Sequence, residues 1–443
     1  MKCINKIMIS LVSAAGLLAV SCTETPGEYI MSEGVPTVHY VRPVDVAASD
    51  SLLTSAYMDN MICIVGENLR SVQQLYFNDQ KAILNNSYIT DNTLLVTVPG
   101  EIPSEVSDKM YLITAAKDTV TYDFSVIIPG PTLSSLKCEY VPVGGTAVLY
   151  GDYFIDDPNV PFTMTFPNDV PVTNIISLTK NAVTFEVPEG AVEGKIEVST
   201  IYGTATSAFH YMDSRGMMFE FDGVTNLTNH GWHNRVIASE GGLTGNYVQL
   251  GDGATELTHT SWGDGQFAFE YWCGDWNSPQ NITSGDGIAL YNLVDFSDFS
   301  NMSLKFEMFI PSSNPWSATA MQICFEGVDK VTLSGNPIDG EATVAGANAY
   351  AFNNEQNNLG TWGRAMYRPW TSTGSYHTDD EWITVTIPIS EFKYDKDGAP
   401  TDNIAQSEKD FASLTIFMLG GGVEGVNCTP IVRIDNIRAV PNR

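Results

Sequence analysis

The feature that constrains this chain most is a plan of short strand-forming segments that occurs twice between residues 36 and 212. Each copy opens on Pro-Thr followed by Val or Leu, continues with an apolar run followed by Gly-x-x-Leu or Gly-x-x-Phe, and later shows a run that ends in Val-Pro. The segments are 36–38, 61–69 and 94–99 in the first copy, and 131–133, 147–154 and 183–188 in the second. Because these runs are short, alternate in polarity and are broken by Gly, Pro, Asn and Asp, they predict two small antiparallel β-sandwiches.

The sequence changes character near residue 213. All eight tryptophans of the 443-residue chain lie beyond this point. Strand-like runs alternate there with long loops rich in Gly, Asn, Ser and Asp, and helical periodicity is not evident. At roughly 100–200 residues per domain, the length allows about three domains. We therefore expect an all-β chain with a first module (36–128), a second module (129–212) and a larger, jelly-roll-like C-terminal domain (213–443).

The N-terminus has the composition of an export signal. Lys2 and Lys6 precede an apolar stretch, residues 7–20, that is too short to span a bilayer as a helix. Residues 18–22 resemble a bacterial lipobox, which implies that Cys22 carries a lipid and becomes the new N-terminus. We expect a signal peptide at 1–21 and a polar tether at 22–35. A plain signal peptide, with Cys22 incidental, is the alternative.

Charge and cysteine usage exclude several classes of function. The formal net charge is −30, so the chain lacks the Lys/Arg surface that binding to nucleic acid requires, whereas a neutral ligand is compatible with this charge. Beyond the signal and Cys22, five scattered cysteines remain without a Cys-x-x-Cys pair. That number and spacing predict neither a zinc ribbon nor a disulfide framework, and small buried side chains are the simpler interpretation.

The tryptophans of the C-terminal domain are the candidate binding residues. An indole face packs against the axial C–H groups of a sugar ring while the hydroxyls bind polar side chains at the rim. Three stretches, 271–277, 313–317 and 362–370, combine aromatic residues with such polar groups. We expect contacts to a glycan from Trp276, Trp316, Trp272, Asn314, Trp362, Arg364, Tyr367 and Trp370.

Some of these rings could instead belong to the core. Trp382 begins an apolar strand, which favours a structural role, and Trp272 continues an alternating strand, so both roles stay open for it. Trp276 and Trp316 lie in polar segments beside Gly and Pro, where burial is harder. They are therefore the strongest candidates for contact with a ligand.

Signals for catalysis or for a bound metal are weak. Glycosidases need two carboxylates about 5 to 10 Å apart, and no run of paired carboxylates occurs on a predicted strand. His230 and His233 have no third ligand nearby. Asp222 and Asp435 match places where jelly-roll modules hold a structural calcium ion, although surface carboxylates are an equal interpretation. We expect no enzyme and no cofactor, and leave calcium open.

The order of landmarks in residues 36–212 resembles the IPT/TIG immunoglobulin-like family. This resemblance implies that the first two modules are tandem immunoglobulin-like β-sandwiches that act as spacers. Together with Cys22 and the ending 431–437, the whole organisation resembles the surface glycan-binding proteins of Bacteroidetes polysaccharide-utilisation systems.

That second resemblance implies a function and a location. It predicts a non-catalytic lipoprotein of the outer membrane that holds a neutral glycan of the β-glucan, xyloglucan or mannan class at the cell surface, beside a SusC/SusD-like transporter pair. The aromatic platform is expected in the C-terminal domain. A surface adhesin without glycan specificity is the alternative, and a jelly-roll glycosidase is a third one.

Overall fold

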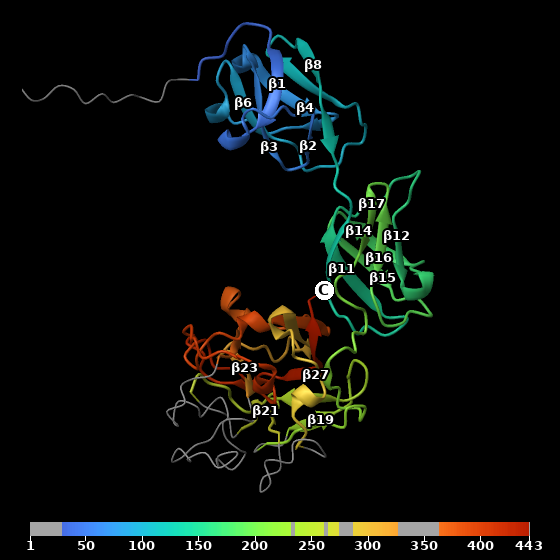
Figure 1. The fold of residues 1–443 in the computed structure, drawn as a ribbon, viewed down its shortest axis with the longest axis vertical. Coiled ribbons are helices and arrows are strands. Elements are labelled where there is room, and N and C mark those ends of the chain that lie inside the picture. The colour runs from blue at the N-terminus through green and yellow to red at the C-terminus, as the bar shows by residue number, and fades with distance from the viewer. Residues whose placement is uncertain (1–28, 232–234, 261–264, 274–286, 327–362, 443) are drawn as a thin grey trace, which may run out of the picture. The chain divides into compact units, whose positions relative to one another are not determined.

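The computed structural model describes residues 29–231, 235–260, 265–273, 287–326 and 363–442 (Figure 1). The described residues form β-strands, turns and short 3-10 helices, with no α-helix among them, so the all-β prediction is confirmed. Within these residues no helix has the length and hydropathy needed to cross a membrane. The chain folds into two compact units that divide between Pro129 and Gly130.

The first unit is a β-sandwich. One sheet has the order β1-β3-β6, a second has the order β5-β4-β7-β8, and β2 and β9 form a parallel pair. Alternate side chains of the two sheets, such as Ile64 and Leu112, meet in a common core. The strands are β1 (Thr37–Pro43), β2 (Ser55–Tyr57), β3 (Met61–Glu67), β4 (Val72–Phe77), β5 (Gln80–Lys81), β6 (Thr93–Thr97), β7 (Lys109–Thr114), β8 (Thr119–Asp123) and β9 (Ser125–Ile127), with 3-10 turns at Val46–Ala48, Leu69–Ser71 and Asn86–Tyr88.

The second module repeats this plan with two four-stranded sheets. Their orders are β10-β11-β15-β14 and β13-β12-β16-β17, and residues such as Leu149 and Val198 fill the core between them. The strands are β10 (Thr132–Leu136), β11 (Thr146–Asp152), β12 (Thr163–Phe166), β13 (Val170–Pro171), β14 (Ile175–Thr179), β15 (Ala182–Glu186), β16 (Glu197–Thr200) and β17 (Gly203–Thr206), with a 3-10 turn at Pro167–Asp169.

The glycine landmark of the repeat has a steric cause. A Cβ atom on Gly66 would lie 1.9 Å from the carbonyl oxygen of Thr37, and one on Gly151 would lie 2.0 Å from that of Thr132. In both modules the first strand crosses the end of its neighbour at a register shift, which brings the two backbones together. Any larger residue would push the strands apart at this point.

The C-terminal domain contains a six-stranded and a four-stranded sheet. The first has the order β19-β20-β27-β22-β25 with β18 also paired to β27, and the second has the order β21-β26-β23-β24. The strands are β18 (Met217–Phe219), β19 (Val236–Ala238), β20 (Tyr247–Leu250), β21 (Ala268–Tyr271), β22 (Met302–Phe309), β23 (Met321–Glu326), β24 (Ala365–Tyr367), β25 (Ile383–Pro388), β26 (Ser413–Met418) and β27 (Val432–Pro441), with 3-10 turns at Leu290–Asn292, Phe299–Asn301, Pro369–Ser372, Ile389–Glu391 and Glu408–Asp410.

One apolar core joins these two sheets. Phe306 and Ile434 of the six-stranded sheet share it with Phe269 and Ile416 of the four-stranded sheet. A two-layer β-sandwich with its core between the sheets was predicted for this part of the chain. The four-stranded sheet is also buried on its second face, where Glu270 and Thr415 are fully buried.

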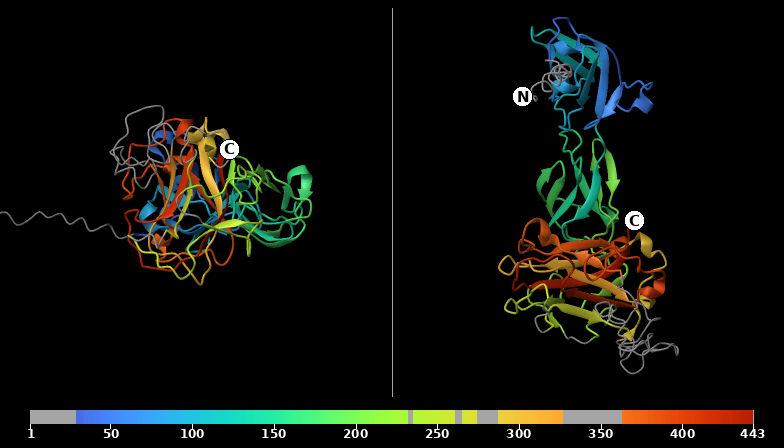
Figure 2. Two further views of the ribbon diagram at one scale, coloured as in Figure 1. Left: turned by 90° about the horizontal axis from the view of Figure 1, so that it is seen from below. Right: turned by 90° about the vertical axis from the view of Figure 1, so that its left-hand side faces the viewer.

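The second module packs against the C-terminal domain within the second compact unit (Figures 1 and 2). The backbone of Thr384 in β25 donates to the carbonyl oxygen of Lys137 at 2.8 Å, and the backbone N–H of Glu139 donates to Thr384 Oγ1 at 2.7 Å. Tyr140 donates from its hydroxyl to the carbonyl oxygen of Asp213 at 2.7 Å. The edge strand β25 is therefore covered by the second module along this stretch.

A buried ionic network completes this junction. The carboxylate of Glu139 pairs with Lys305 at 2.5 Å and with Arg438 at 2.8 Å, and Arg438 also pairs with Glu307 at 2.8 Å. Thr384 donates to Glu307 at 2.8 Å. All four charged residues are buried. Two acids and two bases balance one another, so burial of this group leaves no uncompensated charge.

Candidate functional site

Three of the predicted contact tryptophans belong to the core, which corrects their assignment as a platform. Trp272 is 1% exposed and Trp316 is fully buried, while Trp370 is 5% exposed. Trp316 and Trp370 donate from Nε1 to the same carbonyl oxygen, that of Thr319, at 2.9 and 2.8 Å. Trp272 donates to Thr415 Oγ1 at 3.2 Å. Because a buried indole has no free face, none of the three can stack on a sugar in this conformation.

The reason for the error at Trp316 is the backbone around it. The segment after Pro315 does not run over the surface, since Trp316 and Tyr376 exchange two backbone hydrogen bonds of 2.9 and 2.8 Å. This bridge holds the segment in place, and the indole belongs to the same apolar core as Met321. A polar, proline-containing stretch therefore reads as a loop although it packs as part of the sandwich.

The two other predicted polar contacts, Arg364 and Asn314, both have partners within the protein. Arg364 is fully buried, donates to Gln322 Oε1 at 2.9 Å and lies 5.9 Å from the ring centre of Phe417, so its assignment as an exposed ligand contact is wrong. Asn314 is half-buried and donates to the carbonyl oxygen of Thr429 at 2.9 Å. Its amide ties two loops together.

The three remaining predicted contacts are Tyr367, Trp276 and Trp362, and none of them is shown to be fully buried. Tyr367 is half-buried, its ring centre lies 6.0 Å from that of Trp316, and burial raises the pKa of its hydroxyl. Trp276 and Trp362 lie outside the described residues. Their role as glycan contacts therefore stays a prediction.

The connections to Trp276 and Trp362 start from one end of the four-stranded sheet. Tyr271 at the end of β21 and Phe325 near the end of β23 both pair with Leu414 of β26. The segments 274–286 and 327–362, which contain the two tryptophans, follow directly after these strand ends. The described strand ends that precede these segments therefore lie at the same end of the sheet.

The second face of this four-stranded sheet carries buried polar groups near the same ends of the strands. Glu270 and Glu326 flank Thr415 and Ser413 of β26 on the face opposite the main core, and Gln322 lies on the same face. His230 lies beside the strand end, since its backbone N–H donates to the carbonyl oxygen of Glu270 at 2.9 Å. Sequence patterning missed this polar row because β21 and β26 are buried on both faces and do not alternate clearly.

The two carboxylates considered for calcium have protein partners. Asp222 accepts from the backbone N–H of Asn246 at 2.8 Å, and Asp435 accepts from that of Asn436 at 2.7 Å and from Thr244 Oγ1 at 3.3 Å. Burial, with help from nearby Glu307 and Asp222, raises the pKa of Asp435 to about 8. Calcium at this place stays a prediction.

One other group of possible metal ligands occurs within the part of the chain that the structure describes. Glu193, His210 and Asp213 place one ligand atom each within 4.8 Å of the others. Arg215 pairs with Asp213 at 2.8 Å, and Ser214 donates to Glu193 at 2.7 Å. These contacts already satisfy the two carboxylates, so the group needs no metal ion to explain it.

The architecture defines an all-β protein of β-sandwich modules followed by a larger, jelly-roll-like domain. The family model of the surface glycan-binding protein B xyloglucan binding domain matches residues 211–441. The chain therefore belongs to the family of surface glycan-binding proteins, and binds glycan. The resemblance inferred from the sequence is confirmed.

Three individual proteins are similar to this chain, over different lengths. The crystal structure of surface glycan-binding protein PbSGBP-B from Prevotella bryantii is 44% identical, with a TM-score of 0.73, and the match covers 94% of this chain and 100% of that one. SGBP-B from a complex xyloglucan utilization locus in Bacteroides uniformis is 16% identical with a TM-score of 0.41, over 92% of this chain and 100% of that one. An IPT/TIG domain-containing protein of Bacteroides ovatus is 28% identical over 154 residues, and the match covers 33% of this chain and 30% of that protein.

Proposed function

We propose that the chain is a non-catalytic lipoprotein of the outer membrane that captures a neutral glycan, of the β-glucan, xyloglucan or mannan class, for uptake. The observation that carries this proposal is the match of the xyloglucan-binding-domain family to residues 211–441. The net charge of −30 supports a neutral ligand, because an anionic polysaccharide would be repelled. Among the three glycan classes we favour xyloglucan, because the matched family is a xyloglucan binding domain.

We assign the glycan contacts to the segments that leave the end of the four-stranded sheet. Trp276 and Trp362 remain the candidates, since Trp272, Trp316 and Trp370 are in the core. Residues near Trp276 include Asp275 and Asn277, which can bind sugar hydroxyls.

The family match supports binding without hydrolysis. The family model that covers residues 211–441 is that of a domain that binds glycan.

Attachment and partners are proposed from the sequence. We assign a signal peptide to residues 1–21, lipidation to Cys22, and a tether to 22–35 that leads into the modules at 36–128 and 129–212. The glycan would then pass from residues 213–443 to a SusC/SusD-like transporter pair. Retention of the wild-type chain in membranes, and release of a Cys22→Ser variant into the soluble fraction, tests the anchor.

Native electrophoresis in gels that contain soluble polysaccharide tests the glycan. The mature chain should migrate more slowly with xyloglucan, mixed-linkage β-glucan or mannan than in an empty gel, and an assay for reducing ends should detect no cleavage. A Trp276→Ala, Trp362→Ala variant should lose most of the retardation, whereas the control Tyr57→Ala, Tyr88→Ala, which removes two exposed rings of the first module, should migrate like wild type. Wild-type migration unchanged by every polysaccharide would contradict the proposal.

A further inference from the structure

One tryptophan of the described residues is not buried. Trp272, Trp316 and Trp370 are at most 5% exposed, whereas Trp382 is half-buried. The sequence favours a structural role for Trp382 because it begins an apolar strand. Its partial exposure in a glycan-binding protein calls for a second explanation, since an accessible indole face is the group that packs on a sugar ring.

The indole of Trp382 is held in one orientation by three contacts. Its Nε1–H donates to the carbonyl oxygen of Gly241 at 3.2 Å. Its ring centre lies 5.7 Å from that of Tyr247 and 5.7 Å from that of Phe309. The guanidinium of Arg433 lies over both of these rings, at 5.1 and 5.0 Å from their centres. An indole fixed in this way loses little conformational entropy when a ligand packs against it.

Trp382 also lines a groove between the second module and the C-terminal domain, which we call the junction groove. It has a volume of about 220 Å³. Val141 and Thr146 belong to its wall from the second module, and Leu243 lies on the side of the C-terminal domain with Trp382. At its rim Lys137 forms an ion pair with Glu381, whose side chain is 61% exposed.

The composition of the junction groove fits a neutral sugar. The indole and aliphatic side chains can take the apolar face of a pyranose ring, while Thr146, Lys137 and Glu381 can bind hydroxyl groups. The charges of Lys137 and Glu381 cancel, so the groove does not select an ionic ligand. Its volume is below the ~300–1,000 Å³ of sites for drug-sized ligands, which suits a single sugar unit.

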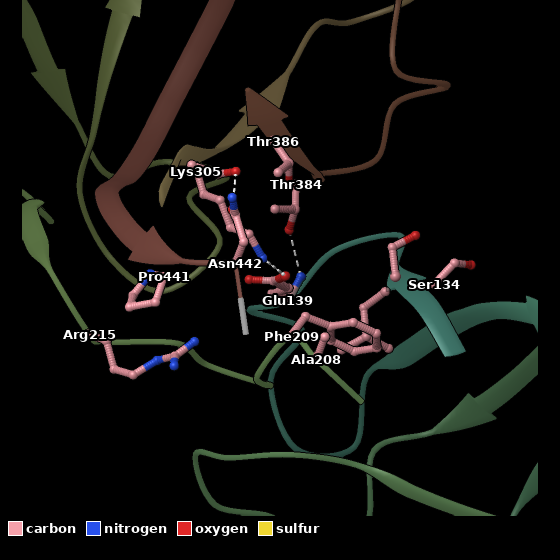
Figure 3. A pocket seen from close by; sticks show the side chains of 13 residues that line it. Ser134, Glu139, Ala208, Phe209, Arg215, Lys305, Thr384, Thr386, Pro441 and Asn442 are labelled. Atoms are coloured by element: carbon pink, nitrogen blue, oxygen red, sulfur yellow. Dashed lines mark hydrogen bonds and ion pairs between the residues drawn. The ribbon is translucent and has the colours of Figure 1, made fainter. Parts of the chain in front are cut away.

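A larger hollow on the same junction lacks these properties (Figure 3). It has a volume of about 370 Å³ and is lined by Ser134, Lys305 and Thr386, among others. Its aromatic side chain, Phe209, is only 7% exposed and belongs to the core of the second module. Lys305 and Glu139 in its wall are paired with each other in the junction network. The half-buried indole of Trp382 therefore distinguishes the junction groove.

We propose that the junction groove is a second glycan-binding subsite, in which one neutral sugar unit stacks on Trp382 and its hydroxyls bind Lys137, Glu381 or Thr146. This inference rests on the glycan binding described above. The second module then contributes directly to binding and is more than a spacer.

The test uses affinity electrophoresis and calorimetry of the mature chain with xyloglucan, mixed-linkage β-glucan and mannan. Trp382→Ala should weaken binding to the retained polysaccharide about tenfold, and Trp382→Phe should weaken it less. Thr146→Gln should narrow the groove from its other wall without touching Trp382, and should weaken binding as well. The matched control is Thr163→Gln, an exposed strand threonine of the same module, which should bind like wild type.

The outcomes separate this subsite from the proposed main site. If the wild-type chain binds but Trp382→Ala and Thr146→Gln bind equally well, the junction groove is not a subsite, and the main site stands. If a Trp276→Ala, Trp362→Ala variant retains weak binding that Trp382→Ala then removes, the subsite is supported. If Trp382→Ala lowers the melting temperature strongly, Thr146→Gln alone decides, and unchanged binding by that variant overturns the proposal.

Discussion

The carboxylate of Glu139 and the guanidinium of Arg438 meet at 2.8 Å although 299 positions separate them in the sequence. Glu139 belongs to the second module and Arg438 to the last strand of the C-terminal domain. Arg438 is fully buried, and its guanidinium carbon also lies 4.9 Å from the ring centre of Tyr140. The C-terminal domain therefore completes a buried charge network only with a residue that the second module supplies.

Removing that carboxylate should destabilise the C-terminal domain. In Glu139→Gln, Lys305 and Arg438 keep their charges but lose their shared partner, which costs about 3 kcal/mol of unfolding free energy. Urea unfolding followed by tryptophan fluorescence measures this directly, because all eight tryptophans lie beyond residue 212.

The matched control for that change is Glu381→Gln at the rim of the same junction. Glu381 pairs with Lys137, but its side chain is 61% exposed, so the expected loss is below about 1 kcal/mol. If the two variants lose the same free energy of unfolding, the buried network around Glu139 stabilises the domain no more than the exposed pair does.

Truncation should reveal the same dependence. A fragment of residues 213–443 leaves Arg438 and Lys305 without Glu139, and also exposes the edge of β25 that the second module covers. We expect residues 130–443 to unfold in one cooperative transition and residues 213–443 to melt at a lower temperature and aggregate more readily. Calorimetry of the two fragments checks this, and identical melting curves would contradict it.

The buried indole of Trp316 should act through stability. Trp316→Ala removes a fully buried ring and its hydrogen bond to the carbonyl oxygen of Thr319, at an expected cost of about 3 to 5 kcal/mol. The fraction of molecules that remains folded should bind glycan with unchanged affinity, as calorimetry corrected for the folded fraction would show. If Trp316→Ala instead lost glycan binding but kept the stability of the wild-type chain, Trp316 would be a glycan contact after all.

Strand patterning carried the fold prediction a long way. The apolar runs 303–310 and 414–419 have the pattern of strands in the sequence, and they correspond to β22 at Met302–Phe309 and β26 at Ser413–Met418. The sequence also shows the repeated landmarks, because only glycine fits at positions 66 and 151, where a Cβ atom would clash with the backbone of the adjacent strand. Such features depend on neighbours along the chain or on one adjacent strand.

Side-chain exposure in the loops was not readable in the same way. Whether the indole of Trp316 points inward depends on its backbone bridge to Tyr376, sixty positions away. Arg364 can donate a hydrogen bond to Gln322 only because β23 and β24 are paired. The partial exposure of Trp382 likewise depends on how the second module packs beside β25. Long-range packing of this kind leaves no periodic signal in the sequence.

The last prediction concerns Asp435, whose carboxyl is fully buried. Burial and the nearby carboxylates of Glu307 and Asp222 raise its pKa from 3.8 to about 8, against hydrogen bonds from Asn436 and Thr244 that lower it. The folded state therefore holds a proton that the unfolded state releases, so this contribution to stability is complete below about pH 4 and is lost as the pH rises towards 8.

Replacing Asp435 by Asn fixes the neutral form at every pH. Relative to this variant, the wild-type chain should lose on the order of 3 kcal/mol of unfolding free energy between pH 5 and pH 8, as measured by urea unfolding in calcium-free buffer with tryptophan fluorescence. Parallel stability curves for the two proteins across this range would mean that Asp435 is already ionised in the folded state. Its charge would then have to be balanced by a cation, and addition of calcium at pH 8 should raise the wild-type melting temperature and leave that of Asp435→Asn unchanged.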